Sequence, residues 1–471
     1  MKKALAIAGL VSLSVVIGTT SLSAARTARK FSPHQEPRGI GNLVARGDRV
    51  MFVYDAGVKS ATGAVYVRND LQRRFVRVPL VRERGPATTY RALVPARLTR
   101  GHRLLYYAVL RDRKSRRTAR VPAAGRSSAW ILDRPVTVRL GTHVFGQTHA
   151  PGTVVARARA DQVGWQLSEP GQGPSFGPQS FAVGSDRSIW LHDSLNDRML
   201  VWNAGAPDTI ARTVPLPART ADNDVALGPA GSIYVTSGQG HGLGYHIVLS
   251  RLDSIGRPIW TSRLAGDFFG NAQSFVVGTN SSLRTGPDGT LHVLAAMAGL
   301  PGGEQGWMPV AAPGGTPYSR AEQLRRTHWP YQPVTGGLRL VSESYVPPDT
   351  DTAPHEARFA LVDRRGNVAR SWRVLSRTDL SMNPTTPELV GGDPVVVLDA
   401  TAQSTSGFQW EYVVLRLSRT GASERFSLAR TVFGDNLMAD LRIGPDGALY
   451  QLASAPSFGV VISRYSLEGR R

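Results

Sequence analysis

Apolar and polar residues alternate with a period of two along most of the chain, and stretches with the helical period of 3.6 are few. In the first third, the alternating runs cover residues 48–56, 63–67, 74–81, 89–98, 102–111 and 129–140. Turn signals such as Asn69-Asp70 and Gly85-Pro86 separate these runs. Several short strands at this spacing are typical of a β-sandwich. The pattern therefore predicts an all-β fold that begins with one sandwich over residues 45–142.

The densest part of this pattern is Tyr90–Pro95 followed by Leu104–Asp112. Alternate apolar positions put one face of these strands inward, and several arginines fall on the other face. A Tyr-rich strand that ends in Asp before a turn resembles the penultimate strands of immunoglobulin-like and fibronectin-type modules. That resemblance implies a domain that binds or spaces rather than one that catalyses.

From about Gly173 onward the chain repeats a turn of the form Gly-Pro-x-Gly between two strands. The clear copies are Gly228–Tyr234, Gly286–His292 and Gly444–Tyr450, and Gly184–Trp190 is a degenerate one. With weaker copies at Gly337 and Gly392, the spacing runs from 44 to 58 residues. A repeat of this length indicates an array of small β units.

A second unit follows several copies and consists of an apolar strand with a short polar turn that closes on Gly, as in Leu252–Gly256 and Val362–Gly366. Two hairpins per repeat make four strands, which is one propeller blade. Six copies predict a six-bladed β-propeller over residues 160–471. The last blade lacks a fourth strand at the end of the chain, and Val163–Leu167 is the expected closing strand.

The first repeat contains Leu191–Trp202, which resembles the NHL repeat in the positions of Asp193, Asn196 and Arg198. Leu195 departs from the small residue usual there. Asp and Asn at these positions are expected to hold a tight turn through local hydrogen bonds. The resemblance implies an NHL-like propeller, a family that contains binding scaffolds together with some lyases and lactonases, so it does not select one function.

Residues 1–25 have the features of a signal peptide. Lys2 and Lys3 precede an apolar stretch over residues 4–17, and Ser23-Ala24-Ala25 offers small residues for cleavage. The alternative is an uncleaved signal anchor. In either case we expect the protein to be secreted or held in the cell envelope, outside the cytoplasm.

Positive charge is concentrated in the predicted sandwich. Residues 26–142 hold 26 Lys+Arg and 7 Asp+Glu, a net charge of +19, whereas residues 143–471 hold 28 of each. This asymmetry suggests an anionic partner for the basic part, either an envelope polymer or a lipid surface. The alternative is a solvated arginine-rich face, and export argues against nucleic acid. Cysteine is absent, which excludes disulfides, thiolate nucleophiles and Cys-ligated metals.

Candidate metal ligands come from the expected inner strands of the propeller. Counting back four residues from each turn glycine reaches Asp224, Glu388 and Asp440, and Asn223 could add an amide oxygen. Converging carboxylates would suit one divalent, calcium-like cation. The set resembles the ion site of gluconolactonase-like and regucalcin-like enzymes. The alternative is an ordinary polar channel, and His192 and His292 do not fall in one column, so no zinc site is expected.

A long insertion over residues 299–334 mixes aromatic rings with arginines. Such side chains in a loop on a rigid ring are suited to contact a sugar or a peptide. The alternative is that part of the insertion is the outer hairpin of the third blade. The ligand-binding candidates are Trp307, Tyr318, Arg326, Trp329 and Tyr331.

Two functions remain open from the sequence. In the first, the basic module associates with an anionic envelope surface, and the propeller binds a glycan or protein partner. In the second, a metal at the channel mouth supports lactonase-like hydrolysis or lyase chemistry by polarising a carbonyl or activating water.

Overall fold

The computed structural model is almost entirely β-strand, as expected. Its one α-helix in the described residues, α1 (Arg320–Arg326), begins at Ser319, whose hydroxyl accepts a hydrogen bond from the Glu322 amide. No helix in this part of the chain has the length and hydropathy to cross a membrane. The described residues are 30–36, 41–83, 88–123, 125–147, 152–167, 176–178, 180–217, 224–239, 246–264, 275–276, 282–297, 305–327, 332–345, 356–382, 388–404, 407–431 and 440–467.

Two sheets form the N-terminal part of the structure. Their inward-facing side chains share one apolar core that includes Phe52, Tyr54, Val65, Tyr106 and Leu110. Sheet A has the order β1 (His34–Gln35), β3 (Val50–Asp55), β7 (Thr89–Val94), β6 (Val81–Arg82). Sheet B has the order β2 (Leu43–Ala45), β10 (Ser127–Leu132), β8 (Arg103–Asp112), β4 (Ala61–Asn69), β5 (Val76–Pro79), with β9 (Thr118–Val121) paired to β8.

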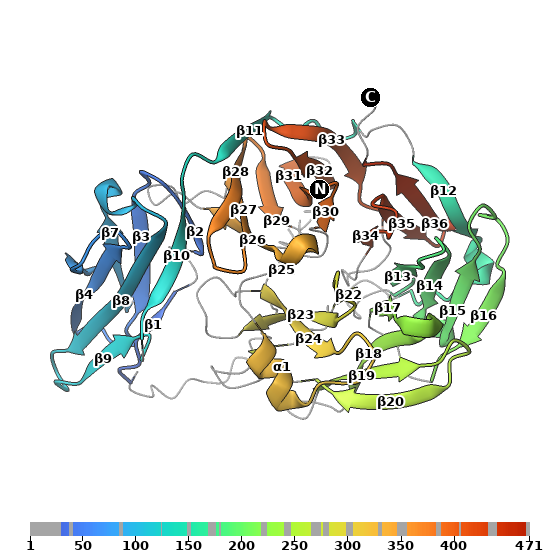
Figure 1. Ribbon diagram of the computed structural model, residues 1–471, viewed down its shortest axis with the longest axis horizontal. Helices are drawn as coiled ribbons and strands as arrows, with labels where there is room; N and C mark the ends of the chain where they lie inside the picture. Colours follow the sequence, from blue (N-terminus) through green and yellow to red (C-terminus); the bar gives the residue numbers. More distant parts are fainter. Residues whose placement is uncertain are drawn as a thin grey trace, which may run out of the picture.

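The remaining described strands form six small sheets around a common centre, in a propeller-type arrangement (Figure 1). The first three sheets, in chain order, are β13 (Ser180–Val183), β14 (Ile189–Asp193), β15 (Arg198–Trp202), β16 (Arg212–Pro215); β17 (Val225–Leu227), β18 (Ile233–Gln239), β19 (His246–Leu252), β20 (Pro258–Arg263); and β21 (Phe275–Val276), β22 (Leu283–Thr285), β23 (Leu291–Met297), β24 (Gln305–Ala311).

The last three sheets continue the ring. They are β25 (Gln332–Pro333), β26 (Arg339–Tyr345), β27 (Glu356–Val362), β28 (Val368–Ser376), with β11 (Val136–Gly141) added beside β28; β29 (Asp379–Met382), β30 (Glu388–Val390), β31 (Asp393–Ser404), β32 (Gly407–Leu417), β33 (Ala422–Ala429); and β34 (Leu441–Ile443), β35 (Leu449–Ala455), β36 (Gly459–Tyr465), with β12 (Thr153–Ala158) beside β36.

The repeated turns adopt one geometry. In the three clear copies and the degenerate one, the first glycine donates its N–H to the carbonyl four residues later: 2.8 Å at Gly184, 2.8 Å at Gly228, 2.7 Å at Gly286 and 2.9 Å at Gly444. The last glycine has a positive φ, +82° at Gly289 and +72° at Gly447, which other residues rarely adopt. The sequence repeat therefore marks the hairpin between the innermost strand and the next one.

The sixth sheet is closed by a strand from upstream, but not by the one expected. Strand β12, Thr153–Ala158, pairs antiparallel with β36, whereas in the expected Val163–Leu167 segment Gln166 forms only an isolated bridge with Phe176. The inward side chains of β12 are Ala156 and Ala158, both fully buried. Their small size gave the closing strand a weak apolar signal compared with Trp165.

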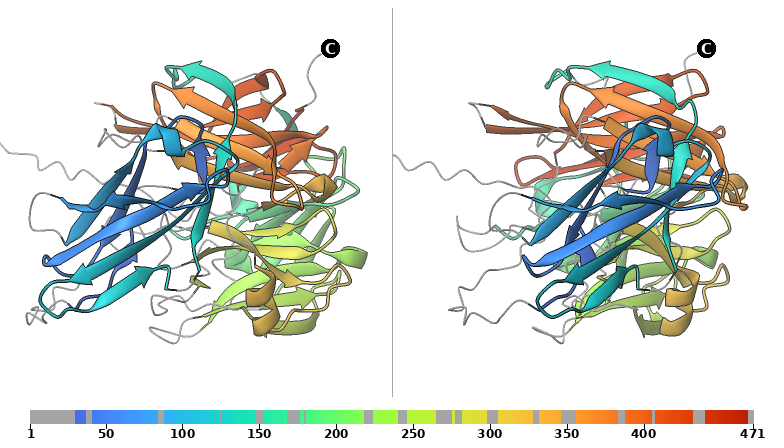
Figure 2. Two further views of the ribbon diagram at one scale, coloured as in Figure 1. Left: turned by 60° about the vertical axis from the view of Figure 1, so that its left-hand side comes forward. Right: turned by 90° about the vertical axis from the view of Figure 1, so that its left-hand side faces the viewer.

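The N-terminal sheets dock on the fourth propeller sheet through β2 and β10 (Figure 2). Apolar contact there is formed by Leu43, Trp130, Leu132, Val341, Ala360 and Val362. The Trp130 indole N–H donates to the Gly366 carbonyl at 2.9 Å. In addition, Glu343 accepts the backbone N–H groups of Asn42 and Leu43 at 2.5 and 2.8 Å. The two parts are therefore held in a fixed orientation.

Candidate functional site

The centre of the ring is occupied by the side chain of Arg442, which β34 contributes. Its Nε donates to the Phe181 carbonyl at 3.1 Å and its Nη1 donates to the Leu283 carbonyl at 2.8 Å. Its Nη2 lies 2.5 Å from both carboxylate oxygens of Asp224. One guanidinium thus connects the inner strands of the first, second, third and sixth sheets.

Asp224 is fully buried, and its carboxylate accepts hydrogen bonds in addition to this ion pair. The Leu283 N–H donates to Oδ2 at 2.6 Å, and the Ser180 hydroxyl and the Val225 N–H donate to Oδ1. A buried carboxylate needs such compensation, because an isolated charge in the interior is strongly unfavourable. Asp224 is therefore a structural anion whose counterion is Arg442.

A second ion pair crosses the centre between the third and fifth sheets. Arg284, on β22, pairs with Glu388, on β30. Their side chains are 12% and 23% exposed, so this pair is less completely enclosed than Arg442 with Asp224. Nη1 of Arg284 is buried and has no acceptor among the described residues.

Asp440 lies in a different environment, just before β34. Its carboxyl accepts a hydrogen bond from the Tyr412 hydroxyl at 2.7 Å, and that hydroxyl accepts one from Arg430 Nε at 3.0 Å. Burial raises the pKa of Asp440 above its ordinary value, and Arg430 and Tyr412 offset this only in part. Burial also raises the pKa of Tyr412 well above its ordinary value.

We expect Asp440→Asn to be at least as stable as the wild type at neutral pH. Because the folded-state pKa is raised, ionising Asp440 removes stability as the pH rises from the unfolded-state pKa through the folded one. Asparagine stays neutral and can still accept from Tyr412. Urea unfolding at about pH 4 and about pH 8 would measure the difference. A marked loss at pH 8 would show instead that the ionised carboxylate is needed.

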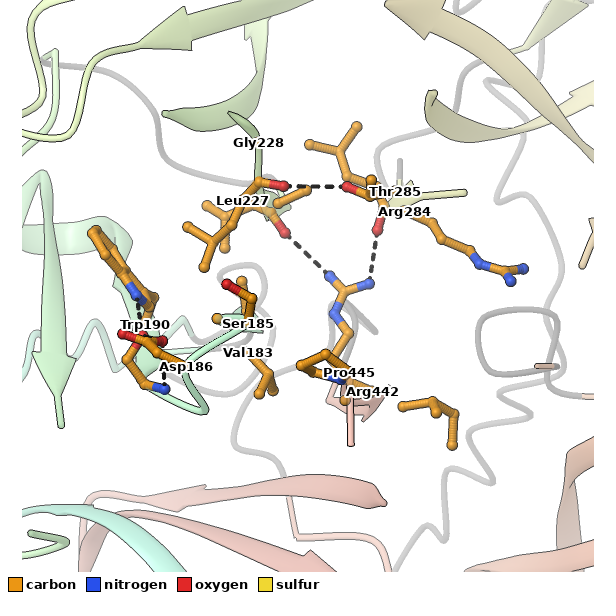
Figure 3. A pocket seen from close by; sticks show the side chains of 18 of the residues that line it. Val183, Ser185, Asp186, Trp190, Leu227, Gly228, Arg284, Thr285, Arg442 and Pro445 are labelled. Carbon is orange, nitrogen blue, oxygen red and sulfur yellow. Dashed lines mark hydrogen bonds between the residues drawn. The ribbon is translucent and has the colours of Figure 1, made fainter. Parts of the chain in front are cut away.

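The ion pairs Arg442–Asp224 and Arg284–Glu388 adjoin a cavity of about 680 Å³ at the end of the inner strands. Arg442 lies in its middle and Arg284 points away from Arg442 (Figure 3). Its wall includes the repeated turns of four sheets, together with the stacked pair Arg212 and Trp190, whose guanidinium carbon lies 4.5 Å from the ring centroid. The lining combines apolar side chains with charges of both signs, which come from three arginines, Asp186 and Glu388.

The predicted metal ligands thus have these positions: Asp224 is paired with Arg442, Glu388 with Arg284, and Asp440 is bonded to Tyr412. Asn223 lies outside the described residues. The three carboxylates are not among the groups of three acidic or His side chains whose ligand atoms lie within 4.8 Å of one another in the described part of the chain. A cation at Asp224 would have to displace a guanidinium, so calcium binding stays a prediction.

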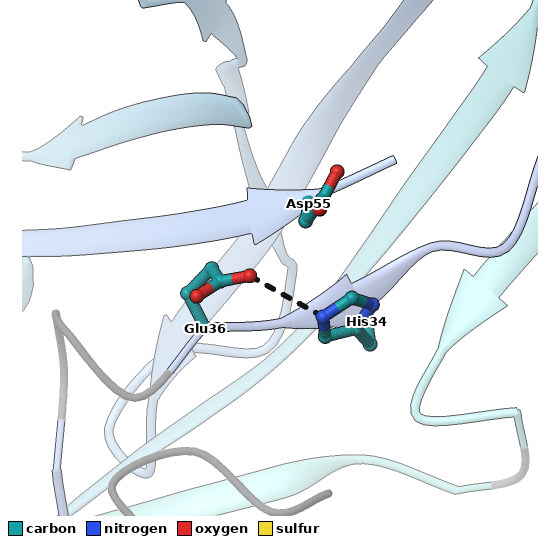
Figure 4. A group of neighbouring side chains, drawn as sticks. All are labelled: His34, Glu36 and Asp55. Carbon is teal, nitrogen blue, oxygen red and sulfur yellow. Dashed lines mark ion pairs between the residues drawn. The ribbon is translucent and has the colours of Figure 1, made fainter. Parts of the chain in front are cut away.

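One such group does occur, in the N-terminal sheets, and the sequence did not point to it. The register of β1 on β3 puts His34 opposite Asp55, with Glu36 beside them (Figure 4). His34 Nε2 lies 3.3 Å from Glu36 Oε1. Asp55 accepts the Gly57 N–H at 2.8 Å, within the turn after β3, and also the hydroxyl of Thr88, which lies just before the neighbouring strand β7. These contacts give the three side chains a structural role between neighbouring strands.

The aromatic insertion is divided between a strand, a helix and undescribed residues. Trp307 is buried in β24, opposite Leu294 of β23, so this part is the outer hairpin that the alternative described. Arg326, in the last turn of α1, stacks on Tyr318 at 4.4 Å from the ring centroid. Trp329 and Tyr331 lie outside the described residues. The structure brings Tyr318 and Arg326 together and leaves Trp307 in the interior.

The NHL-like residues form the local network expected of them. Asp193 is fully buried, and its Oδ2 accepts from Asn196 Nδ2 and Arg198 Nε, both at 2.8 Å. Its Oδ1 accepts the Gly164 N–H at 2.9 Å, which ties the segment before the first sheet to this turn.

His292 is buried in the third sheet; burial, reinforced by Arg284, lowers its pKa to about 4.

Comparison with known proteins adds no family. No protein-family description and no curated protein matches the sequence. Among solved structures, virginiamycin B lyase from Staphylococcus aureus is 9% identical with a TM-score of 0.30, covering 62% of this chain and 95% of that one. An endo-arabinase from Bacteroides thetaiotaomicron is 13% identical with a TM-score of 0.29, covering 69% and 100%. An ulvan lyase is 10% identical with a TM-score of 0.32, covering 69% and 96%.

At such identities and scores, these likenesses carry no argument about activity. The class of the protein follows from its own architecture: a propeller-type arrangement of small antiparallel sheets, with an arginine at the centre, joined to two N-terminal sheets. Four-stranded sheets arranged radially pack against their neighbours, leave only short, protected edges and surround a central channel.

Proposed function

We propose that this chain is an exported binding protein. Its basic N-terminal module associates with an anionic surface of the cell envelope, and its propeller binds a glycan or protein partner. The observation that carries this proposal is the central arginine: Arg442 neutralises Asp224, the buried carboxylate that a catalytic cation would require. The net charge of +19 over residues 26–142 supports the choice of an anionic partner.

The finer description of the fold belongs to the same proposal. We take the six sheets as the blades of one NHL-like ring and the two N-terminal sheets as an immunoglobulin-like sandwich. The equivalent turns and the Asp193 network support the first, and the shared core of sheets A and B supports the second. Residues 1–25 would direct export, with the mature chain secreted or retained in the envelope.

The alternative function is a metal-dependent, lactonase-like hydrolase or lyase at the channel mouth. It would need Asp224 and Glu388 to exchange their arginine partners for a divalent ion, and Asp440 to ionise in spite of burial. Metal content of the purified chain, with melting curves in calcium and in chelator, tests it. A bound divalent ion and a melting shift that Asp224→Asn abolishes would favour the enzyme.

Salt should release the protein from isolated envelope material. Screening shortens the range of a charge interaction from about 10 Å at 0.1 M salt to about 3 Å at 1 M. We therefore expect most of the full chain to sediment with the material at low salt and to be in the supernatant at high salt. The same amount bound at both salt concentrations would contradict an electrostatic role for the module.

A further inference from the structure

The outer face of sheet B carries arginines and aromatic rings in one continuous surface. Side chains alternate between the two faces of a strand, and Val65, Val67, Tyr106 and Ala108 point into the core. Their neighbours in sequence therefore point outward. We call this surface the arginine–aromatic face; its members are Tyr66, Arg68, Phe75, Arg77, Tyr107, Arg111 and Arg120.

Aromatic rings hold two of these arginines in place. Tyr66 and Tyr107 are directly opposite each other on β4 and β8, and their rings are stacked at 5.0 Å with an interplanar angle of 8°. Arg120, from β9 on the other side of β8, lies 4.0 Å from the Tyr107 centroid. Arg68 lies 5.2 Å from the Phe75 centroid. Arg68 Nη1 also donates to the Gln72 carbonyl at 2.8 Å and Arg120 Nη2 to the Gly125 carbonyl at 2.5 Å, so both guanidinium groups are oriented before binding.

No acidic side chain balances this face. None of the outward positions of β4, β5, β8 and β9 holds Asp or Glu. Arg77 and Arg111 are exposed, and neither side chain forms a hydrogen bond or ion pair with another described residue. Among the described residues, the propeller covers this sheet at its β2–β10 edge, through Leu43, Trp130 and Leu132, while β4, β8 and β9 extend away from it (Figure 1).

We infer that the arginine–aromatic face is the binding surface for an acidic polysaccharide, an extended chain with acidic groups at regular intervals. This inference rests on the proposed function and specifies its anionic partner. Neighbouring strands lie about 4.8 Å apart, so the backbones of Arg77 on β5 and Arg120 on β9, three strands away, are about 14 Å apart across the sheet. The face therefore extends over four adjacent strands, a width suited to an extended polymer that crosses the strands rather than to one small anion.

The same geometry disfavours two other polyanions. The Tyr107 ring has Tyr66 on one side and Arg120 on the other, so it offers no free face on which a nucleic-acid base could stack. Insertion into a lipid surface needs protruding apolar side chains. The largely exposed apolar side chains described in this module are Leu71 and Val81, and neither belongs to the face.

The test compares two double variants of the full chain that lose the same charge. Arg77→Gln/Arg111→Gln removes two arginines from the face, whereas Arg91→Gln/Arg97→Gln removes two exposed arginines elsewhere on the module. The probe is polygalacturonate, with neutral dextran as control, and binding is measured by calorimetry at low salt. We expect the first variant to bind roughly tenfold to thirtyfold more weakly and the second to change about twofold or less.

Equal weakening of both variants would overturn the assignment of the face and leave the proposed function standing, because general positive charge would then suffice. Wild-type protein that binds neither polygalacturonate nor envelope material would overturn both. Stronger binding to anionic phosphatidylglycerol vesicles or to single-stranded DNA than to polygalacturonate, again lost in the first variant, would keep the face as a site but overturn the polysaccharide. Unchanged melting temperatures of both variants confirm that folding is intact.

Discussion

Arg442→Met should lower the free energy of unfolding by about 3–5 kcal/mol, one of the largest effects of any single substitution in this chain. The substitution leaves Asp224 buried without a counterion and removes hydrogen bonds to the Phe181 and Leu283 carbonyls. Because Asp224, Phe181 and Leu283 belong to different sheets, the substitution removes contacts that join the inner strands at the centre of the ring. Urea unfolding of the full chain, followed by tryptophan fluorescence, measures it.

Two further variants separate the effect of leaving a buried charge unpaired from the effect of losing the other contacts of Arg442. Arg442→Met/Asp224→Asn removes both members of the pair, so it should be more stable than Arg442→Met alone. Arg284→Met is a matched control, since Glu388 is 23% exposed and water can solvate the carboxylate left behind. We expect that control to lose about 1 kcal/mol. If Arg442→Met lost no more than Arg284→Met, the central ion pair would not be what holds the inner strands together.

The repeat predicted much of the propeller because its turn chemistry is local. A glycine that must adopt positive φ and a fixed hydrogen bond across the turn recur in sequence as Gly-Pro-x-Gly. The register was also correct in part: Ser180 and Asp224, each four residues before a turn glycine, are hydrogen-bonded to each other. Positions fixed by a short segment of backbone can be read from a short segment of sequence.

The central arginines were missed although a signal existed. Arg284 and Arg442 both lie two residues before a turn glycine, and the equivalent positions in the first two copies are Ala182 and Ala226. The small side chains leave space into which the arginine of another sheet extends. An aligned position that holds Arg in some repeats and Ala in others indicates that the long side chain of one sheet occupies the space left by the small side chain of another. Its partner, Asp224, was instead interpreted as a metal ligand, because carboxylate positions alone do not reveal their counterion.

The joint between the two parts of the chain was not predictable in the same way. Strand β11 pairs parallel with β28, more than 230 residues later, and its alternating pattern fits a sandwich strand equally well. Arg358 is fully buried at the same joint, which composition alone would not suggest for an arginine. Long-range pairings of this kind depend on which surfaces meet, and periodicity does not contain that information.

Arg358 connects the N-terminal sheets to the fourth propeller sheet through ionic and neutral acceptors. Its Nη2 lies 2.5 Å from Asp48, its Nη1 donates to the Leu43 carbonyl at 3.0 Å, and its Nε lies 2.7 Å from Glu356. Burial raises the pKa of Glu356, but Arg373 and Arg358 lower it more, so the pKa lies below its ordinary value. The resulting stabilisation is present above the unfolded-state pKa and is lost as the pH falls through the folded one.

Arg358→Met should therefore cost about 3–5 kcal/mol and move acid unfolding to a higher pH, because Asp48 and Glu356 lose a buried partner. Arg373→Met is the control: it removes the other arginine on Glu356, is 30% exposed, and should cost about 1 kcal/mol. Denaturation at several pH values measures stability, and small-angle X-ray scattering reports whether the N-terminal sheets stay docked. If Arg358→Met behaved like its control in both measurements, apolar contact around Trp130 would be sufficient to fix the orientation.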